Sequence, residues 1–251
     1  MSKPKALILR APGTNCDVET AFAFEMVGVQ ADRIHINQII DAPETLAEYQ
    51  ILCFPGGFSF GDDIAAGRIL ANQILNRIRD AVEGFIAKDK LVLGICNGFQ
   101  VLVKTGFLVA PDEDGLCATL TWNDSGRFTD RWVRLKTDGS QCVFLKGVDE
   151  VYLPIAHAEG KFVARNDDIL DRMQAAGQLA LRYHSNGASD NPNGSTRDIA
   201  GICDVTGRVF GLMPHPERHV LATQHPRWTR EGLKDRPDGI AIFENAANYF
   251  A

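Results

Sequence analysis

Cys96 stands at a position where a cysteine can act as a nucleophile. It follows the apolar run at residues 91–95 and precedes an apolar pattern with helical spacing, which predicts a buried strand before it and a helix after it. The first N–H groups of a helix carry partial positive charge, which favours the thiolate over the thiol. The neighbours Gly94 and Gly98 would allow a tight elbow and a close approach of substrate. A buried, inert cysteine is the alternative interpretation.

His215 is the candidate partner that would carry the proton. The residues PHPE at 214–217 directly follow the apolar run at 209–213, so this histidine is expected at the end of another strand. A nucleophilic thiol needs such a proton carrier. Glu217 lies two residues further on, where a carboxylate could orient the imidazole and stabilise its cationic form. A surface turn with an incidental histidine is the alternative.

The glycine-rich segment PGGFSFGDD at residues 55–63 has three competing interpretations: a phosphate cradle, an oxyanion hole and a plain tight turn. A P-loop would place Lys and Ser or Thr after the second glycine, whereas Gly61 is followed by two aspartates, which would repel phosphate. An oxyanion hole formed by the backbone N–H groups of Gly57 and Asn97 fits these residues better.

No metal is expected in this chain. His215 and His219 are four residues apart, but a zinc protease motif needs Glu directly after the first histidine on a continuous helix, and Pro216 occupies that place. The cysteines also lack a C-x-x-C pair, so we expect free thiols rather than a zinc site or a disulfide framework. There are six of them, at positions 16, 53, 96, 117, 142 and 203.

Strand-loop-helix units are expected to position these residues. Apolar runs at 6–9, 51–54 and 91–95 each end in a Gly-containing turn, and after the first of them Val18, Ala21, Phe22 and Met26 recur at helical spacing. This alternation predicts an α/β fold: a doubly wound, mostly parallel sheet with helices on both faces. Ligands bind beyond the carboxyl ends of such strands, where all three turns meet.

The rest of the chain departs from this alternation. Residues 117–162 show short alternating pieces and are expected to form a β-rich insertion. Further strands are expected at 179–183, 199–203 and 209–213, with a final helix near 240–250.

Composition bounds the class of protein. The chain has 251 residues, of which 45% are hydrophobic and 23% charged, and this predicts a single globular domain over 1–251. Its 26 basic and 32 acidic residues give a net charge of -6 without a basic cluster, so no nucleic-acid partner is expected. Neither a signal segment nor a run of 18 apolar residues is present, which predicts a cytoplasmic protein that does not bind a membrane.

Several motifs together resemble the class I (triad) glutamine amidotransferases. The segment GICNGFQ at 94–100 is similar to the nucleophile motif of that family, and HPE at 215–217 to its partner. Five motifs in the same order narrow the resemblance to the glutaminase subunits of phosphoribosylformylglycinamidine synthase, from purine biosynthesis. They are PGTNCD at 12–17, FPGGFSFGDD at 54–63, PIAH at 154–157, NPNGS at 191–195 and GLMPHPER at 211–218.

The resemblance implies a role for each candidate residue. Cys96 would attack the side-chain amide carbon of L-glutamine, His215 would pass a proton to the leaving ammonia, and Glu217 would orient His215. Water activated by His215 would then hydrolyse the glutamyl thioester on Cys96, while the N–H groups of Gly57 and Asn97 hold the oxyanion in both steps.

The same resemblance implies that Gln100 contacts the glutamyl portion of the substrate, whereas His157 and Asn193 lie in matching motifs without an assigned role. Ala158 departs from the family pattern, in which glycine is expected, and its methyl group could alter a turn near the glutamine pocket. The tail at 219–251 has no counterpart in the motifs.

A partner chain is also expected. Ammonia released into water at neutral pH becomes ammonium, which is not a nucleophile, so it must be handed over directly. This chain shows no P-loop, and we expect no cofactor in it. The resemblance implies that a large synthetase subunit, which uses ATP and Mg, converts formylglycinamide ribonucleotide to formylglycinamidine ribonucleotide, together with a small third subunit.

Two other functions compete with this one. A cysteine hydrolase or deglycase of related fold would have a histidine directly after the nucleophile, and here Asn97 follows it. A non-catalytic subunit that senses glutamine or binds a partner would be expected to lose Cys96, His215 or Glu217, and all three are present.

Overall fold

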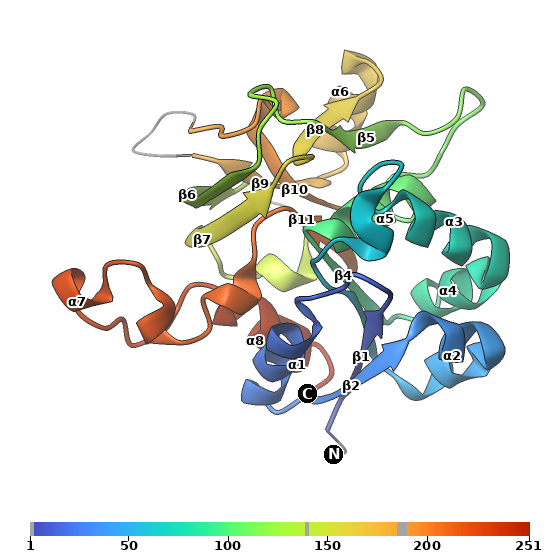
Figure 1. Cartoon of the computed structure of the whole chain (residues 1–251), viewed down its shortest axis with the longest axis horizontal. Helices are drawn as coiled ribbons and strands as arrows, with labels where there is room; N and C mark the ends of the chain where they lie inside the picture. The colour runs from blue at the N-terminus through green and yellow to red at the C-terminus, as the bar shows by residue number, and fades with distance from the viewer. Residues whose placement is uncertain (1–2, 139–140, 185–189) are drawn as a thin grey trace.

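One large sheet runs through the molecule, and its first half is parallel (Figure 1). The computed structural model describes residues 3–138, 141–184 and 190–251. In these ranges a nine-stranded sheet has the order β2-β1-β3-β4-β11-β10-β9-β6-β7. The parallel strands are β2 (Gln30–His35), β1 (Lys5–Arg10), β3 (Ile51–Phe54), β4 (Leu91–Ile95) and β11 (Val209–Leu212). Every residue of β3, β4 and β11 is buried, as expected for strands covered on both faces.

The second half of the sheet is antiparallel. It contains β10 (Ile199–Cys203), β9 (Leu179–Tyr183), β6 (Thr129–Thr137) and β7 (Glu150–His157). A separate pair is formed by β5 (Ala118–Thr121) and β8 (Lys161–Ala164). The segment 117–162 is therefore β-rich, as predicted, and two of its strands extend the main sheet instead of forming a layer of their own.

Helices cover both faces of the parallel half (Figure 1). On one face lie α1 (Asp17–Met26) and α8 (Ile240–Asn248), and on the other lie α3 (Arg68–Arg77), α4 (Arg79–Ile86) and α5 (Asn97–Thr105). The remaining helices are α2 (Ile36–Asp41), α6 (Asp167–Ala175), α7 (Trp228–Glu231) and the 3-10 turns η1 (Pro43–Glu48), η2 (Ser59–Asp62), η3 (Val143–Leu145), η4 (Thr196–Asp198), η5 (Pro216–Arg218) and η6 (Ala222–Gln224). The predicted α/β fold is confirmed.

The helix α1 exists, but the apolar spacing pointed to the wrong face. Val18, Phe22 and Met26 are 61%, 43% and 43% exposed. The buried face carries Ala21, which belongs to that pattern, and Phe24, which does not. The Phe24 ring packs edge-on against Phe243 of α8, with 4.9 Å between the ring centroids. Docking against α8 and the sheet, rather than the periodicity of the segment itself, selects this face.

The tail that the motifs left unassigned packs on the rest of the chain. Besides α8, it contributes His219 and His225, whose ring centroids lie 5.1 Å and 5.8 Å from that of Trp132 of β6. His219 also bonds through Nδ1 to the carbonyl oxygen of Tyr152 at 2.9 Å. In the described ranges, no helix is long and apolar enough to cross a bilayer.

Candidate active site

Cys96 occupies a strained elbow between β4 and α5. Its backbone has φ 51° and ψ -104°, a conformation that L-residues rarely adopt and that costs about 1–3 kcal/mol. The elbow is tight because its glycines have no room for a side chain: a Cβ on Gly98 would lie 1.8 Å from the carbonyl oxygen of Phe54, and one on Gly94 would lie 2.6 Å from Leu102 Cδ1. The predicted elbow is therefore present, with Cys96 at its tip.

His215 and Glu217 form a buried pair at the end of β11. The His215 N–H donates to the carbonyl oxygen of Pro154 at 2.9 Å, which fixes the backbone at this point. His215 Nδ1 lies 2.7 Å from Glu217 Oε1, and the two residues are only 2% and 1% exposed. Since a carboxylate accepts, Nδ1 carries the proton. Nε2 makes no hydrogen bond of ordinary length within the described ranges, which leaves it available for proton transfer.

The charges around His215 favour its protonated form. Burial alone lowers the pKa of His215, but the Glu217 carboxylate, the Cys96 sulfur and the Cys16 sulfur together raise it well above its usual value. The Cys96 sulfur therefore lies close enough to the ring to favour its charged form. The structure thus brings together the three residues predicted from sequence, with His215 in the form that can give up a proton.

The glycine-rich loop lies next to the elbow and is linked to it through Asn97. The Asn97 side chain accepts from the Ser59 N–H at 3.2 Å and donates to Asp62 Oδ1 at 3.0 Å. Asp62, which argued against a phosphate cradle, therefore anchors the start of α5. The N–H of Gly57 has no hydrogen-bond partner among the described residues, and that of Asn97 belongs to the first turn of a helix. The oxyanion hole formed by these two groups stays a prediction.

Gln100 is buried and bonded within the protein. Its Nε2 donates to the carbonyl oxygen of Glu159 at 2.6 Å, and its Oε1 accepts from Asn97 Nδ2 at 3.0 Å. These bonds join α5 to the turn between β7 and β8. A contact between Gln100 and the substrate stays a prediction.

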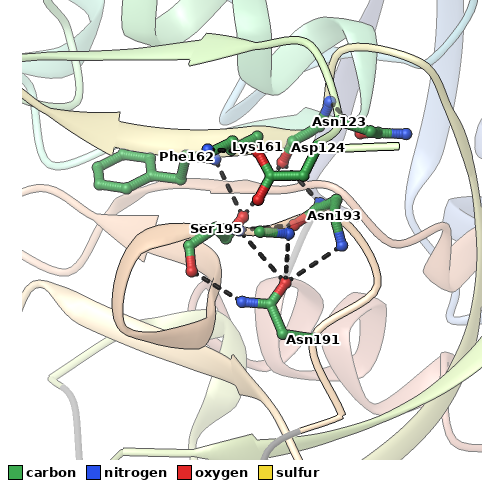
Figure 2. Close-up of polar contacts among 9 residues, drawn as sticks. Asn123, Asp124, Lys161, Phe162, Asn191, Asn193 and Ser195 are labelled. Atoms are coloured by element: carbon green, nitrogen blue, oxygen red, sulfur yellow. Dashed lines mark hydrogen bonds and ion pairs between the residues drawn. The ribbon is translucent and has the colours of Figure 1, made fainter. Parts of the chain in front are cut away.

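The NPNGS motif also bonds to the β7–β8 turn and to the start of β8 (Figure 2). Asn191 Oδ1 accepts from the N–H groups of Asn193, Gly194 and Ser195 at 2.9–3.2 Å, which closes the loop on itself. Asn193 Nδ2 then donates to the carbonyl oxygen of Gly160 at 2.9 Å, and Ser195 Oγ accepts from the Phe162 N–H at 3.0 Å. The motif therefore positions the turn.

His157 is a buried neutral imidazole in this framework. Its Nδ1 lies 3.1 Å from Asn123 Oδ1, and a Cβ on Gly160 would lie 2.2 Å from its ring. Burial, followed by the charge of nearby His215, lowers the pKa of His157 to about 4. Ala158 is not among the residues with positive φ in the described ranges, so its methyl group is compatible with the turn. Gly160 is the position that requires the absence of a side chain.

Cys16 is the site residue that sequence analysis missed. Its sulfur, a His215 ring nitrogen and a Glu217 oxygen all lie within 4.8 Å of one another. These are zinc-ligand types, but the Arg218 guanidinium donates to the Cys16 sulfur at 3.2 Å, and its positive charge opposes a bound cation. The only signal in the sequence was the PGTNCD motif.

Gly56 provides a test of this packing. A Cβ at Gly56 would lie 2.8 Å from His215 Cε1 and 3.0 Å from the Cys16 sulfur, so Gly56→Ala should displace the imidazole. We expect kcat for glutamine hydrolysis to fall about a hundredfold, because a small misplacement of a catalytic group has that effect. Gly84→Ala, where a Cβ meets nothing within 4 Å, is the control in the same assay. Full activity of Gly56→Ala would contradict the geometry.

Comparison with known proteins shows the family and the fold of this chain. The model of the CobB/CobQ-like glutamine amidotransferase domain matches residues 3–250. The phosphoribosylformylglycinamidine synthase subunit PurQ of Dehalococcoides mccartyi is 48% identical over 99% of this chain and 98% of the relative. That of Methanococcus maripaludis is 41% identical over 98% of this chain and 97% of the relative. A chain in the structure of PurLQS from Thermotoga maritima superposes with a TM-score of 0.77 at 31% identity, over 100% of both chains.

Proposed function

Because this chain belongs to the PurQ family of phosphoribosylformylglycinamidine synthase subunits, which are glutamine amidotransferases, we propose that it hydrolyses L-glutamine to glutamate and ammonia with Cys96, His215 and Glu217. The observation that carries this proposal is the buried His215–Glu217 hydrogen bond of 2.7 Å beside the strained Cys96 elbow. The assay that tests it measures the release of glutamate from glutamine. Asparagine, whose side chain is one methylene shorter, is the control substrate and should not be hydrolysed. The proposal would be overturned if the parent protein released glutamate no faster than a Cys96 variant.

The geometry supports a two-step reaction. The Cys96 sulfur attacks the amide carbon of glutamine, and the electron pair moves to the carbonyl oxygen, which the N–H groups of Gly57 and Asn97 would stabilise. His215 then gives its proton to the departing nitrogen, so that ammonia leaves and a glutamyl thioester remains. In the second step, water gives a proton to His215 Nε2 and attacks the thioester, which releases glutamate and restores the Cys96 sulfur.

We propose that the ammonia passes to a synthetase subunit that aminates formylglycinamide ribonucleotide. The neighbouring solved structure is of a PurLQS assembly, which supports a large synthetase partner and a small third subunit for this chain. ATP and Mg are then expected on the synthetase, with no cofactor in this chain. A cytoplasmic location and a single domain over 1–251 fit this role.

Burial of the nucleophile predicts that the partner activates the enzyme. Cys96 is only 5% exposed, so little of the nucleophile is open to solvent in the chain without its partner. We expect turnover of the isolated chain to be slow and to rise about tenfold or more when the synthetase docks, a coupling of ordinary size. Glutamate release measured with and without the synthetase tests this expectation. Equal turnover in the two samples would contradict it.

A further inference from the structure

We propose that Cys16, held by Arg218, is a positioning residue that fixes the His215 imidazole for proton transfer. This inference rests on the proposed glutaminase function and adds to it a second thiol, which does not touch the substrate.

Cys16 reaches the site because the loop before α1 is bonded to the glycine-rich loop. The Cys16 N–H donates to the carbonyl oxygen of Gly56 at 3.3 Å, and the Phe58 N–H donates to that of Gly13 at 3.0 Å. A further bond, from Thr20 Oγ1 to the carbonyl oxygen of Cys16 at 2.7 Å, fixes the residue at the start of α1. The sulfur therefore comes from an element that sequence analysis did not connect with the triad.

The Cys16 sulfur is held in one orientation. It donates to Asn15 Oδ1 at 3.4 Å and accepts from Arg218 Nη2 at 3.2 Å. Arg218 is in turn fixed by Glu19, with 2.8 Å between Nε and the carboxylate. Because Cys16 is 1% exposed and burial raises the pKa of its thiol, it stays protonated at neutral pH. It therefore acts as a neutral, oriented sulfur and not as a second nucleophile.

The sulfur and the imidazole share one narrow space. A Cβ on Gly56 would touch both, at 3.0 Å from the sulfur and 2.8 Å from His215 Cε1, so the two groups lie side by side over this glycine. Removing the sulfur would leave room for the ring to rotate away from the position set by Glu217. Arg218 follows Glu217 by one residue in η5, so the same contact also braces the turn that carries the carboxylate.

Several other groups act on the same cluster. The pKa of His215 is affected by Glu217, Cys96 and Cys16, and His215 in turn lowers the pKa of His157. Arg218 faces Cys16, and buried Cys53 lies close enough to Glu217 to be affected by its charge. Among them the Cys16 contact supports the protonated imidazole. Its removal should therefore move the alkaline limb of the pH profile, where the imidazolium loses its proton, to lower pH.

The experiment compares Cys16→Ala and Cys16→Ser with Cys203→Ala in the complex with the synthetase. Cys203 is also a buried free cysteine, but it lies at the end of β10, where its sulfur bonds to the carbonyl oxygen of Gly177. For Cys16→Ala we expect kcat to fall about tenfold to a hundredfold with KM unchanged within about twofold. The alkaline limb of the Cys16→Ala pH profile should move to lower pH. Cys16→Ser should recover part of the lost kcat and part of the shift in the pH profile, and Cys203→Ala should resemble the parent in both.

A second set of variants tests the route through Arg218. Arg218→Gln should lower kcat in the same direction as Cys16→Ala, and the double variant should be no worse than Cys16→Ala alone, because the proposal has Arg218 act on the imidazole through that sulfur. A folded Cys16→Ala enzyme with the kcat and pH profile of Cys203→Ala would overturn the inference. Full additivity of the Cys16→Ala and Arg218→Gln effects in the double variant would also overturn it. Loss of turnover in Cys96→Ala is read separately, because it tests the glutaminase function and is independent of the Cys16 result.

Discussion

Replacing Cys96 with alanine is expected to lower glutamine hydrolysis at least about ten-thousandfold. The thioester cannot form without the sulfur, and the protein offers no other thiol at the tip of the elbow. Labelling by a glutamine-like electrophile should disappear together with glutamate release. Binding to the synthetase should be intact, because Cys96 is buried and its removal leaves the surface unchanged.

Cys142→Ala is the matched control, since Cys142 is likewise buried but precedes η3 on another part of the chain. It should keep both turnover and labelling of Cys96. Retention of full turnover by Cys96→Ala would exclude the thioester route and with it the proposed use of the triad. A non-catalytic subunit predicts the same low glutamate release for the parent and for both variants.

Glu217→Gln is expected to lower kcat about a thousandfold with little loss of folding stability. The amide can still bond to His215 Nδ1, but it removes the charge that opposes the effect of burial on the pKa of His215. The sign follows from this balance: the pKa of His215 falls, the imidazolium loses its proton at lower pH, and the alkaline limb of kcat/KM moves in the acid direction.

The pH profile separates this effect from simple damage to the fold. Glu244→Gln makes the same chemical change on α8, where the carboxylate pairs with Arg236 near the surface, and should leave the profile in place. A Glu217→Gln enzyme with the parent alkaline limb and parent kcat would show that the carboxylate does not act on His215.

The parallel half of the fold was predictable because its strands are buried on both faces. The runs at 51–54, 91–95 and 209–213 consist almost wholly of apolar residues and end in turns, which is what two covering layers of helix require. Edge strand β2 (QADRIH) was missed, since an edge strand with exposed and half-buried residues has no such run. The face of α1 was wrong because its packing depends on α8, more than 200 residues away in the chain.

The meeting of Cys96 and His215 in space was predictable for a different reason. Cys96 and His215 each follow a strand of the parallel sheet, and the carboxyl ends of β4 and β11 are adjacent because the two strands pair directly. Cys16 was not predictable in this way. Its contact with His215 depends on how the loop before α1 lies against residues 56–58, which no local pattern records. The hydrogen bond from Asn97 to Asp62 was not predictable either, because it also depends on how two distant segments lie against each other.

The left-handed backbone at Cys96 also limits how far this protein can be stabilised without loss of activity. Glycine adopts φ 51° without the strain that the Cβ of cysteine brings, so the substitution that relaxes this point of the chain is the one that removes the proposed nucleophile. Selection for heat resistance alone would therefore favour an inactive protein at this residue. Improved variants must find their stability in other parts of the fold and leave the elbow as it is.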